Sequence, residues 1–171
     1  MAKPLYSRSD VIARVLSAWR ARAVQPHVVG QLLDLACGDN RLVRRNRSGV
    51  GIDIVKYANV NVVCRDLSRL PFRDDHFDTV TILAALNYFD HPDSVLREVR
   101  RVLKPDGTLL VTFLNKTLSR LWHKVKEREI TPRPSFDQAE LTTCLQAANL
   151  RIVAKKSFMF GAKTIYFIKI S

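Results

Sequence analysis

Residues 32–40 read LLDLACGDN, and this stretch constrains the fold more than any other part of the chain. Its apolar first half predicts a strand that ends on the carboxylate of Asp34. Ala36 and Gly38 are small enough for a tight turn, and Asn40 tolerates the left-handed backbone region that closes such a turn. A strand, a tight turn and a following helix place backbone N–H groups and an acid at the carboxyl end of a strand, where α/β folds bind ligands. Taken alone, the stretch also fits a buried strand before a loop.

Two further strand-like runs end in the same way. Residues 49–54 carry Asp53, which lies 19 residues after Asp34 and close to the ~20-residue offset of an acid that binds a ribose. Residues 61–65 are β-branched and apolar, and Asp66 follows them. Three successive strands that each end in Asp predict three acceptors along one edge of a parallel sheet.

The combination of motifs resembles the class I S-adenosylmethionine-dependent methyltransferases, over roughly residues 31–114. The matching strings are LLDLACGDN, GIDI at 51–54, RDLSRLPF at 65–72, DDHFDTV at 74–80 and LREVRRVLKPDGTLLVT at 96–112. Ala36 and Asn40 depart from the family pattern, because they replace the first and third glycines of the usual turn. The resemblance implies S-adenosylmethionine as the cofactor and methyl transfer as the activity.

The resemblance also implies eight cofactor-binding positions. Asp34, Ala36 and Gly38 match the motif that holds the methionine part. Asp53 matches the ribose-binding acid, and Ile54 matches an adenine contact. Asp66 and Leu67 match the residues that read the adenine edge, and Ala84 lies where the backbone passes the methionine group. These positions are Asp34, Ala36, Gly38, Asp53, Ile54, Asp66, Leu67 and Ala84.

Substrate-facing residues are expected after the strand at 79–83. Asn87 and Tyr88 stand where the family places them, and Tyr88 and His91 are candidate catalytic bases, with Tyr6 and His123 as further candidates from flanking elements. A structural alternative exists for each candidate, since Asp90-His91-Pro92 also suits the start of a helix. The string at this position lacks the prolines of enzymes that methylate exocyclic amino groups of bases.

Periodicity predicts the remaining elements and the fold class. Helices are expected over 11–23, after Asn40, over 92–103 and over 136–149, and strands at 31–36, 49–53, 61–64, 79–83, 108–114, 151–158 and 163–170. The last two strands are joined by a linker that permits only an antiparallel hairpin. The expected fold is therefore α/β and Rossmann-like: a doubly wound, mostly parallel seven-stranded sheet that ends in an antiparallel hairpin, with helices on both faces. A nicotinamide-dependent dehydrogenase is disfavoured, because its G-x-G-x-x-G turn is missing.

The segment 115–135 is predicted to be a lid-like insert in a single domain of residues 1–171, which begins with a helical cap at 1–30. Leu118, Leu121, Trp122 and Val125 recur at helical spacing among basic residues, so a basic amphipathic helix is expected, with Trp122 as a substrate contact. Such a helix could cover a hydrophobic substrate, lie on an anionic membrane or rest on nucleic acid. It could equally pack its apolar stripe on the core.

Charge and composition restrict the partners. The chain has 171 residues, 47% of them hydrophobic, with 28 Lys and Arg against 16 acids and a formal charge of +12. It can bury a full core, and its charge favours an anionic substrate while leaving nucleic acid and a membrane surface open. The sequence has neither a long apolar run nor a signal-like segment, so a cytoplasmic protein is expected. Three cysteines without paired spacing predict free thiols and no metal site.

The sequence thus predicts a methyltransferase that uses S-adenosylmethionine on a small or amphiphilic acceptor. An RNA- or ribosome-associated methyltransferase is the alternative within the same class, supported by the charge. A catalytically silent cofactor- or partner-binding module is the third hypothesis.

Overall fold

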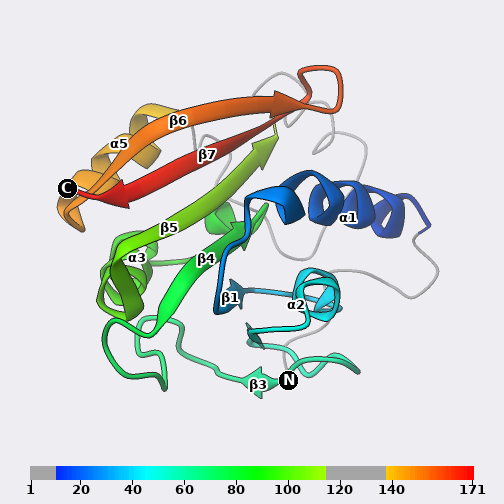
Figure 1. Ribbon diagram of the computed structural model, residues 1–171, viewed down its shortest axis with the longest axis horizontal. Helices are drawn as coiled ribbons and strands as arrows, with labels where there is room; N and C mark the ends of the chain where they lie inside the picture. The colour runs from blue at the N-terminus through cyan, green and yellow to red at the C-terminus, as the bar shows by residue number, and fades with distance from the viewer. Residues whose placement is uncertain (1–10, 115–137) are drawn as a thin grey trace.

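The computed structural model describes residues 11–114 and 138–171, which form a seven-stranded sheet flanked by helices (Figure 1). The strand order is β3-β2-β1-β4-β5-β7-β6. The elements are α1 (Val11–Val24), η1 (Gln25–His27), β1 (Leu32–Leu35), α2 (Arg41–Asn46), β2 (Val50–Asp53), β3 (Val62–Val63), β4 (Phe77–Leu83), η2 (Leu86–Tyr88), α3 (Pro92–Val102), β5 (Leu103–Leu114), α5 (Gln138–Ala147), β6 (Leu150–Phe158) and β7 (Lys163–Ile170).

The sheet has the predicted mixture of directions. Strands β1 to β5 pair in parallel, whereas β7 pairs antiparallel with both β5 and β6. The predicted hairpin and the predicted fold class are therefore confirmed. The strand order places the carboxyl ends of β1 and β4 next to each other at the centre of the sheet. The chain leaves these two strands in opposite directions, β1 towards β2 and β4 towards β5. Ligands of open α/β sheets bind at such a switch point.

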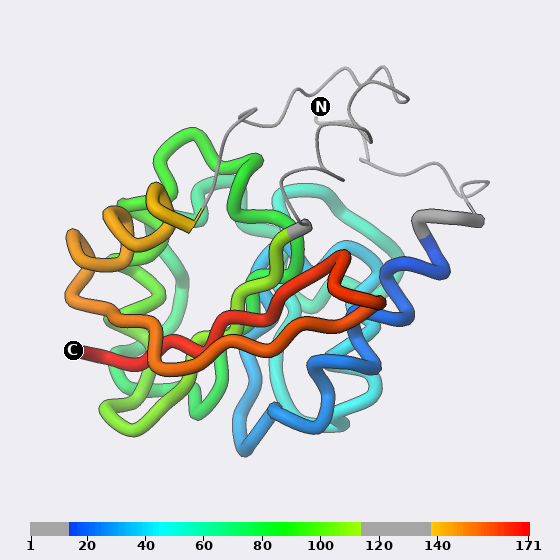
Figure 2. Tube along the Cα trace, turned by 90° about the horizontal axis from the view of Figure 1, so that it is seen from above, coloured from blue at the N-terminus to red at the C-terminus, as the bar shows by residue number. Residues whose placement is uncertain are grey.

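Helices cover both faces of the sheet, as Figure 2 shows from above. Side chains of a strand alternate between the faces, so Leu109 and Val111 join one apolar cluster and Leu110 joins the other. The first cluster includes apolar residues of α3 and α5, and the second includes those of α1 and α2. The core therefore consists of two layers, one on each side of the sheet.

The largest departure from the predicted elements is the start of β5. The strand begins at Leu103, which pairs with Phe77, and the regular register resumes only at Thr79 with Thr108. One residue of β4, Asp78, therefore faces residues 104–107. Lys-Pro-Asp-Gly is looped out as an irregularity within the strand, which keeps its turn chemistry and lengthens β5.

Part of the sequence prediction falls outside the described residues. The basic segment 115–135 with Trp122 and His123, and also Tyr6, belong to that part. Within the described ranges, none of the helices is both long enough and apolar enough to cross a membrane.

Candidate functional site

The turn after β1 uses the left-handed backbone region three times. Ala36, Gly38 and Asn40 have φ values of 54°, 56° and 57°. The expectation that Asn40 suits this conformation is confirmed, and Ala36 adopts it although its β-carbon makes the conformation less favourable than it is for glycine. A β-carbon added to Gly38 would meet no atom within 4 Å. The turn therefore borders open space at its centre.

Asp53 connects this turn to the end of β2. Its carboxylate accepts the Gly38 N–H at 2.9 Å and the Val55 N–H at 3.0 Å. Burial raises the pKa of the Asp53 carboxyl above its usual value, and the backbone N–H donors oppose that rise. A carboxylate offers about four acceptor positions, so Asp53 retains capacity for hydroxyl donors of a ligand. Ile54, the next residue, leaves 44% of its surface exposed.

Asn40 has a structural role that the sequence interpretation missed. Its Nδ2 donates to the Asn59 carbonyl oxygen and to Asn61 Oδ1, each at 2.7 Å, and Asn61 Oδ1 also accepts the Gly51 N–H at 2.8 Å. A β-carbon at Gly51 would lie 2.0 Å from Asn40 Oδ1. Asn40 thus fixes the turn against β2 and the following loop, and Gly51 makes room for it.

Asp34 is the most deeply buried acid of the site, with 3% of its surface exposed. Burial raises the pKa of its carboxyl to about 7, while a 2.6 Å hydrogen bond donated by the Thr81 hydroxyl acts in the opposite direction. Thr81 lies on β4 directly beside Asp34 in the parallel register. The hydrogen bond between Asp34 and Thr81 therefore joins β1 and β4 at the switch point, just before the turn that follows β1.

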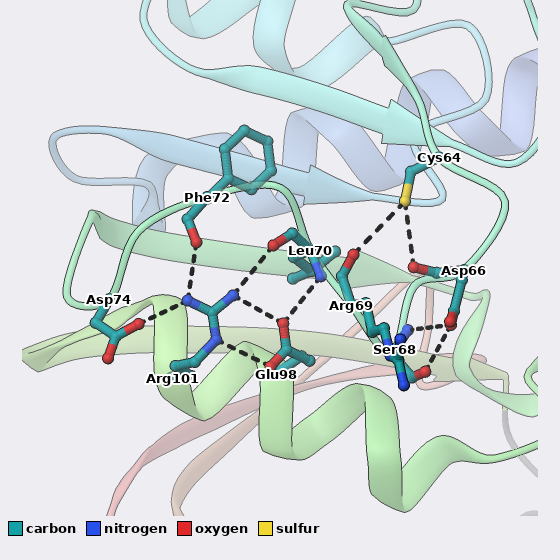
Figure 3. A network of polar contacts seen from close by, with 9 residues as sticks. All are labelled: Cys64, Asp66, Ser68, Arg69, Leu70, Phe72, Asp74, Glu98 and Arg101. Atoms are coloured by element: carbon teal, nitrogen blue, oxygen red, sulfur yellow. Dashed lines mark hydrogen bonds and ion pairs between the residues drawn. The ribbon is translucent and has the colours of Figure 1, made fainter.

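Asp66 and Leu67 follow β3 in a loop held by α3. Asp66 is exposed and its carboxylate accepts the Ser68 N–H and hydroxyl, which lower the pKa of the Asp66 carboxyl. The Leu67 side chain is buried in the core. Cys64 Sγ lies 3.2 Å from the Asp66 carbonyl oxygen and closes the start of the loop (Figure 3).

Arg101 of α3 holds the second half of this loop. Figure 3 shows its guanidinium between the loop carbonyls and two acids. It donates to the carbonyl oxygens of Leu70 at 3.1 Å and Phe72 at 2.8 Å, to Asp74 at 2.6 Å, and to both oxygens of Glu98 at 2.9 and 2.8 Å. Bidentate, charge-assisted hydrogen bonds of this kind are stronger than neutral ones.

Replacing Arg101 with methionine should lower the free energy of unfolding by about 2 kcal/mol, because two loop carbonyls lose their donor and the Glu98 carboxylate keeps only the Leu70 N–H. Arg97→Met is the matched control on the same helix: its ion pair with Asp93 is exposed at i,i+4, so the expected loss is about 0.5 kcal/mol or less. Urea unfolding of both variants checks this. Equal losses would show that the Arg101 network does not fix the loop.

The residues after β4 come together at the same edge of the sheet. Ala84 has a φ of 55° and donates its N–H to the Thr112 carbonyl oxygen at 3.1 Å, so it turns the chain at the end of the strand. Asn87 and Tyr88 are half-buried in η2. The His91 side chain is exposed and its carbonyl oxygen accepts the N–H groups of Ser94 and Val95. His91 is therefore the N-cap residue of α3 and contributes through its backbone.

Three polar residues near this edge were absent from the sequence interpretation. Thr112 Oγ1 on β5 is buried and, within the part of the chain that is described, has no hydrogen-bond partner. Lys163 at the start of β7 is 4% exposed, and Arg20 of α1 acts electrostatically on both Lys163 and Asp34. By strand alternation, Lys163 shares a face of β7 with the apolar residues Ile165 and Phe167.

Comparison with known proteins tests which protein family has this arrangement of residues. A family model described as a methyltransferase domain matches residues 33–111, which run from β1 to the second half of β5. The central part of the chain matches the methyltransferase domain family, as the sequence predicted. The predicted family is confirmed, and S-adenosylmethionine is the cofactor that this methyltransferase domain implies.

Solved methyltransferases share the fold of the domain. A SAM-dependent methyltransferase of Thermotoga maritima superposes with a TM-score of 0.74 at 18% identity, over 91% of this chain and 89% of that one. A S-adenosylmethionine-dependent methyltransferase of Clostridium acetobutylicum gives 0.68 at 15% identity, over 96% and 94%. At these identities the likeness concerns the fold. The [4+2]-cyclase SpnF also matches, with a TM-score of 0.60, so the fold hosts more than one chemistry.

Curated relatives match about half of the chain. The ubiquinone/menaquinone biosynthesis C-methyltransferases UbiE of Pseudomonas putida (strain F1) and Pseudomonas aeruginosa (strain LESB58) are 38% and 40% identical to it over 90 residues. The match covers 53% of this chain and 32% of each relative. The chain therefore spans about a third of the length of the relatives that it matches.

Proposed function

We propose that this chain transfers the methyl group of S-adenosylmethionine to a small or amphiphilic acceptor. The observation that carries the proposal is the corner between β1 and β2, where Asp53 is fixed by the Gly38 and Val55 N–H groups beside open space. A carboxylate with acceptor capacity to spare suits the two hydroxyls of a ribose. The adjacent Ile54 surface suits an adenine ring.

The other cofactor contacts follow from the carboxyl edge of the sheet. In the proposed site, Ala36 and Gly38 would face the methionine part above the buried Asp34, and the Ala84 backbone would pass beside it. The Asp66 carboxylate and the Leu67 backbone would contact the adenine edge. The bound cofactor would supply a methyl group that is already activated by the sulfonium.

The protein must align the acceptor with the methyl group and, where needed, remove a proton from the acceptor. Tyr88, half-buried after β4, is the first candidate to receive a proton from the acceptor, and Asn87 is a candidate to orient it. His91 is the second candidate base, although its exposed position at the start of α3 suits a structural role.

The acceptor is proposed from two observations. The UbiE relatives carry the name of quinone-biosynthesis C-methyltransferases, which favours an amphiphilic aromatic acceptor methylated on carbon. The +12 charge favours an acidic one. An RNA acceptor is the second candidate, because Arg151, Lys155 and Lys156 are exposed on the edge strand β6.

Replacing Asp53 with alanine should weaken binding of S-adenosylhomocysteine at least tenfold, because the ribose would lose its acceptor. Asp39→Ala is the matched control: Asp39 belongs to the same turn but pairs with Arg41 at the surface, and its variant should bind within twofold of the wild type. Calorimetric titration of the three proteins measures this, with NADH as a ligand that should not bind.

Methyl transfer is then measured with radiolabelled S-adenosylmethionine on reduced naphthoquinones, phenols, amines and bulk tRNA. Transfer to a small aromatic acceptor is the expected result. Exclusive transfer to tRNA, with strongly salt-dependent binding, would favour the RNA-directed alternative. A wild-type chain that does not bind S-adenosylhomocysteine would contradict the proposal and favour the binding-module hypothesis.

A further inference from the structure

Lys163 is a buried cation at the carboxyl edge of the parallel strands. It is the first residue of β7 and lies opposite Leu114, the last residue of β5. Figure 1 shows the β6–β7 turn and the tip of β5 at the same end of the sheet. Ile165 and Phe167 pack in the cluster beneath α1 and α2, and Lys163 shares their face by strand alternation. Its side chain therefore enters the interior on the α1 side.

The neighbouring charge that acts on Lys163 is positive. Burial lowers the pKa of its ammonium to about 7, and the positive charge of Arg20 on α1 adds to this effect. Among the described residues, Lys163 forms no ion pair with a carboxylate. Lysines are almost never this buried unless they are paired. Within the described ranges, Lys163 is therefore affected by a second cation, Arg20, and has no anionic partner.

The register places Lys163 near the point where the methyl acceptor would lie. Leu83 pairs with Thr112, and Thr112 pairs with Ile165, so β4 and β7 flank β5 at this level. Neighbouring strands are ~4.8 Å apart, which puts the chain at Ala84 and the start of β7 about 10 Å from each other. A small aromatic molecule with one acidic substituent spans such a distance. Asp53, in contrast, lies on β2, on the other side of β1 and β4.

We propose that Lys163, together with Arg20, binds a negatively charged oxygen of the methyl acceptor and so selects small anionic aromatic molecules. The proposal rests on the proposed function, because it assigns the substrate class of the same site. An anion would supply the partner that the buried ammonium lacks within the described part of the chain, and a charge-assisted hydrogen bond in this setting would be strong and orienting. A neutral analogue would leave the cation unpaired.

The test uses calorimetric titration of the full chain, with and without S-adenosylhomocysteine, against benzoate, phenyl phosphate and the neutral benzamide. The wild type should bind at least one of the two anions tenfold or more tightly than benzamide. Lys163→Met should reduce that preference to within twofold, whereas Lys163→Arg should retain it. Lys169→Met is the matched control, because Lys169 lies on the same face of β7 and donates to the Asp106 carbonyl oxygen at the far end; it should behave as the wild type.

Three outcomes would overturn the inference. The wild type could show no preference for either anion, or Lys163→Met could retain the preference. Lys163→Met could also weaken S-adenosylhomocysteine as much as the anions, which would assign the lysine to the cofactor. Failure of the wild type to bind S-adenosylhomocysteine would count against the proposed function alone, since the titration without that ligand still reports on Lys163.

Discussion

Replacing Gly49 with alanine should lower the free energy of unfolding by about 3–5 kcal/mol, through the combined effects of steric overlap and a strained backbone. A β-carbon at Gly49 would lie 2.4 Å from the carbonyl oxygen of Leu32 and 2.7 Å from its β-carbon. Gly49 also has a φ of 132°, which side-chain-bearing L-residues rarely adopt. Neither neighbour can move freely, because Leu32 is fully buried at the start of β1.

Thermal and urea unfolding check the effect against Gly161→Ala. Gly161 also has a positive φ, of 79°, but an added β-carbon would meet nothing within 4 Å. The control isolates the backbone strain and should lose about 1 kcal/mol. The Gly49 variant should melt about 10 °C lower than the wild type, given the usual few degrees per kcal/mol for a chain of this size. Equal losses at the two positions would refute the close packing of β1 against the turn before β2.

Replacing Lys163 with methionine should raise the free energy of unfolding by about 4 kcal/mol at pH 7, because about 1.4 kcal/mol corresponds to each pKa unit between the two states. The pKa of Lys163 falls from 10.5 in the unfolded chain to about 7 in the folded one, chiefly through burial and then through Arg20. Its strand neighbours Leu114 and Phe158 are apolar. The folded state of the wild type therefore binds fewer protons than the unfolded state between pH 7 and about 10.5.

The sign of the pH dependence follows from that difference. The wild type gains stability from this group as pH rises from 7 towards 10.5, so the advantage of the methionine variant should shrink to roughly 2 kcal/mol at pH 9. Below pH 7 the advantage should stay constant. Asp34, whose pKa is raised to about 7, makes stability fall as the pH rises from about 4 to 7 and keeps it lower above pH 7, but it does so in both proteins and cancels in the comparison.

Urea unfolding at pH 6, 7, 8 and 9 measures the two curves, with Lys169→Met as the control that should show no comparable gain. A methionine variant that is less stable than the wild type at pH 7 would show that Lys163 has a stabilising partner. Together with the anion titration, the result separates a lysine kept for ligand binding from one that supports the fold.

Much of the fold could be predicted because the relevant signals are local. The strands around Asp34 and Asp53 are short apolar runs that end on an acid, and the helix over Pro92–Val102 has both a start signal and an apolar face. The hairpin of β6 and β7 followed from the length of its linker. The start of β5 at Leu103 could not be predicted, because residues 104–107 have turn chemistry and only pairing with β4 makes them part of a strand.

The proposed site also has features that could be predicted from the sequence and features that could not. The acids that end strands are visible in the sequence, and so is the demand for a left-handed backbone at Gly38 and Asn40. The role of Asn40 depends on Asn59, Asn61 and Gly51, which come from other segments. Likewise, the Leu67 side chain proved to be core, since its neighbours in space are residues of other elements.

By itself, the sequence determined the family, the strand and helix order, and the row of acids at the edge of the sheet, because each depends on residues close together in the chain. The tertiary structure alone decided which polar groups are buried and which lack partners. The raised pKa of Asp34 and the isolation of Lys163 come from α1, β4, β5 and β7 packing around them. Desolvation and charge act through space, so the chain must be folded before either value exists.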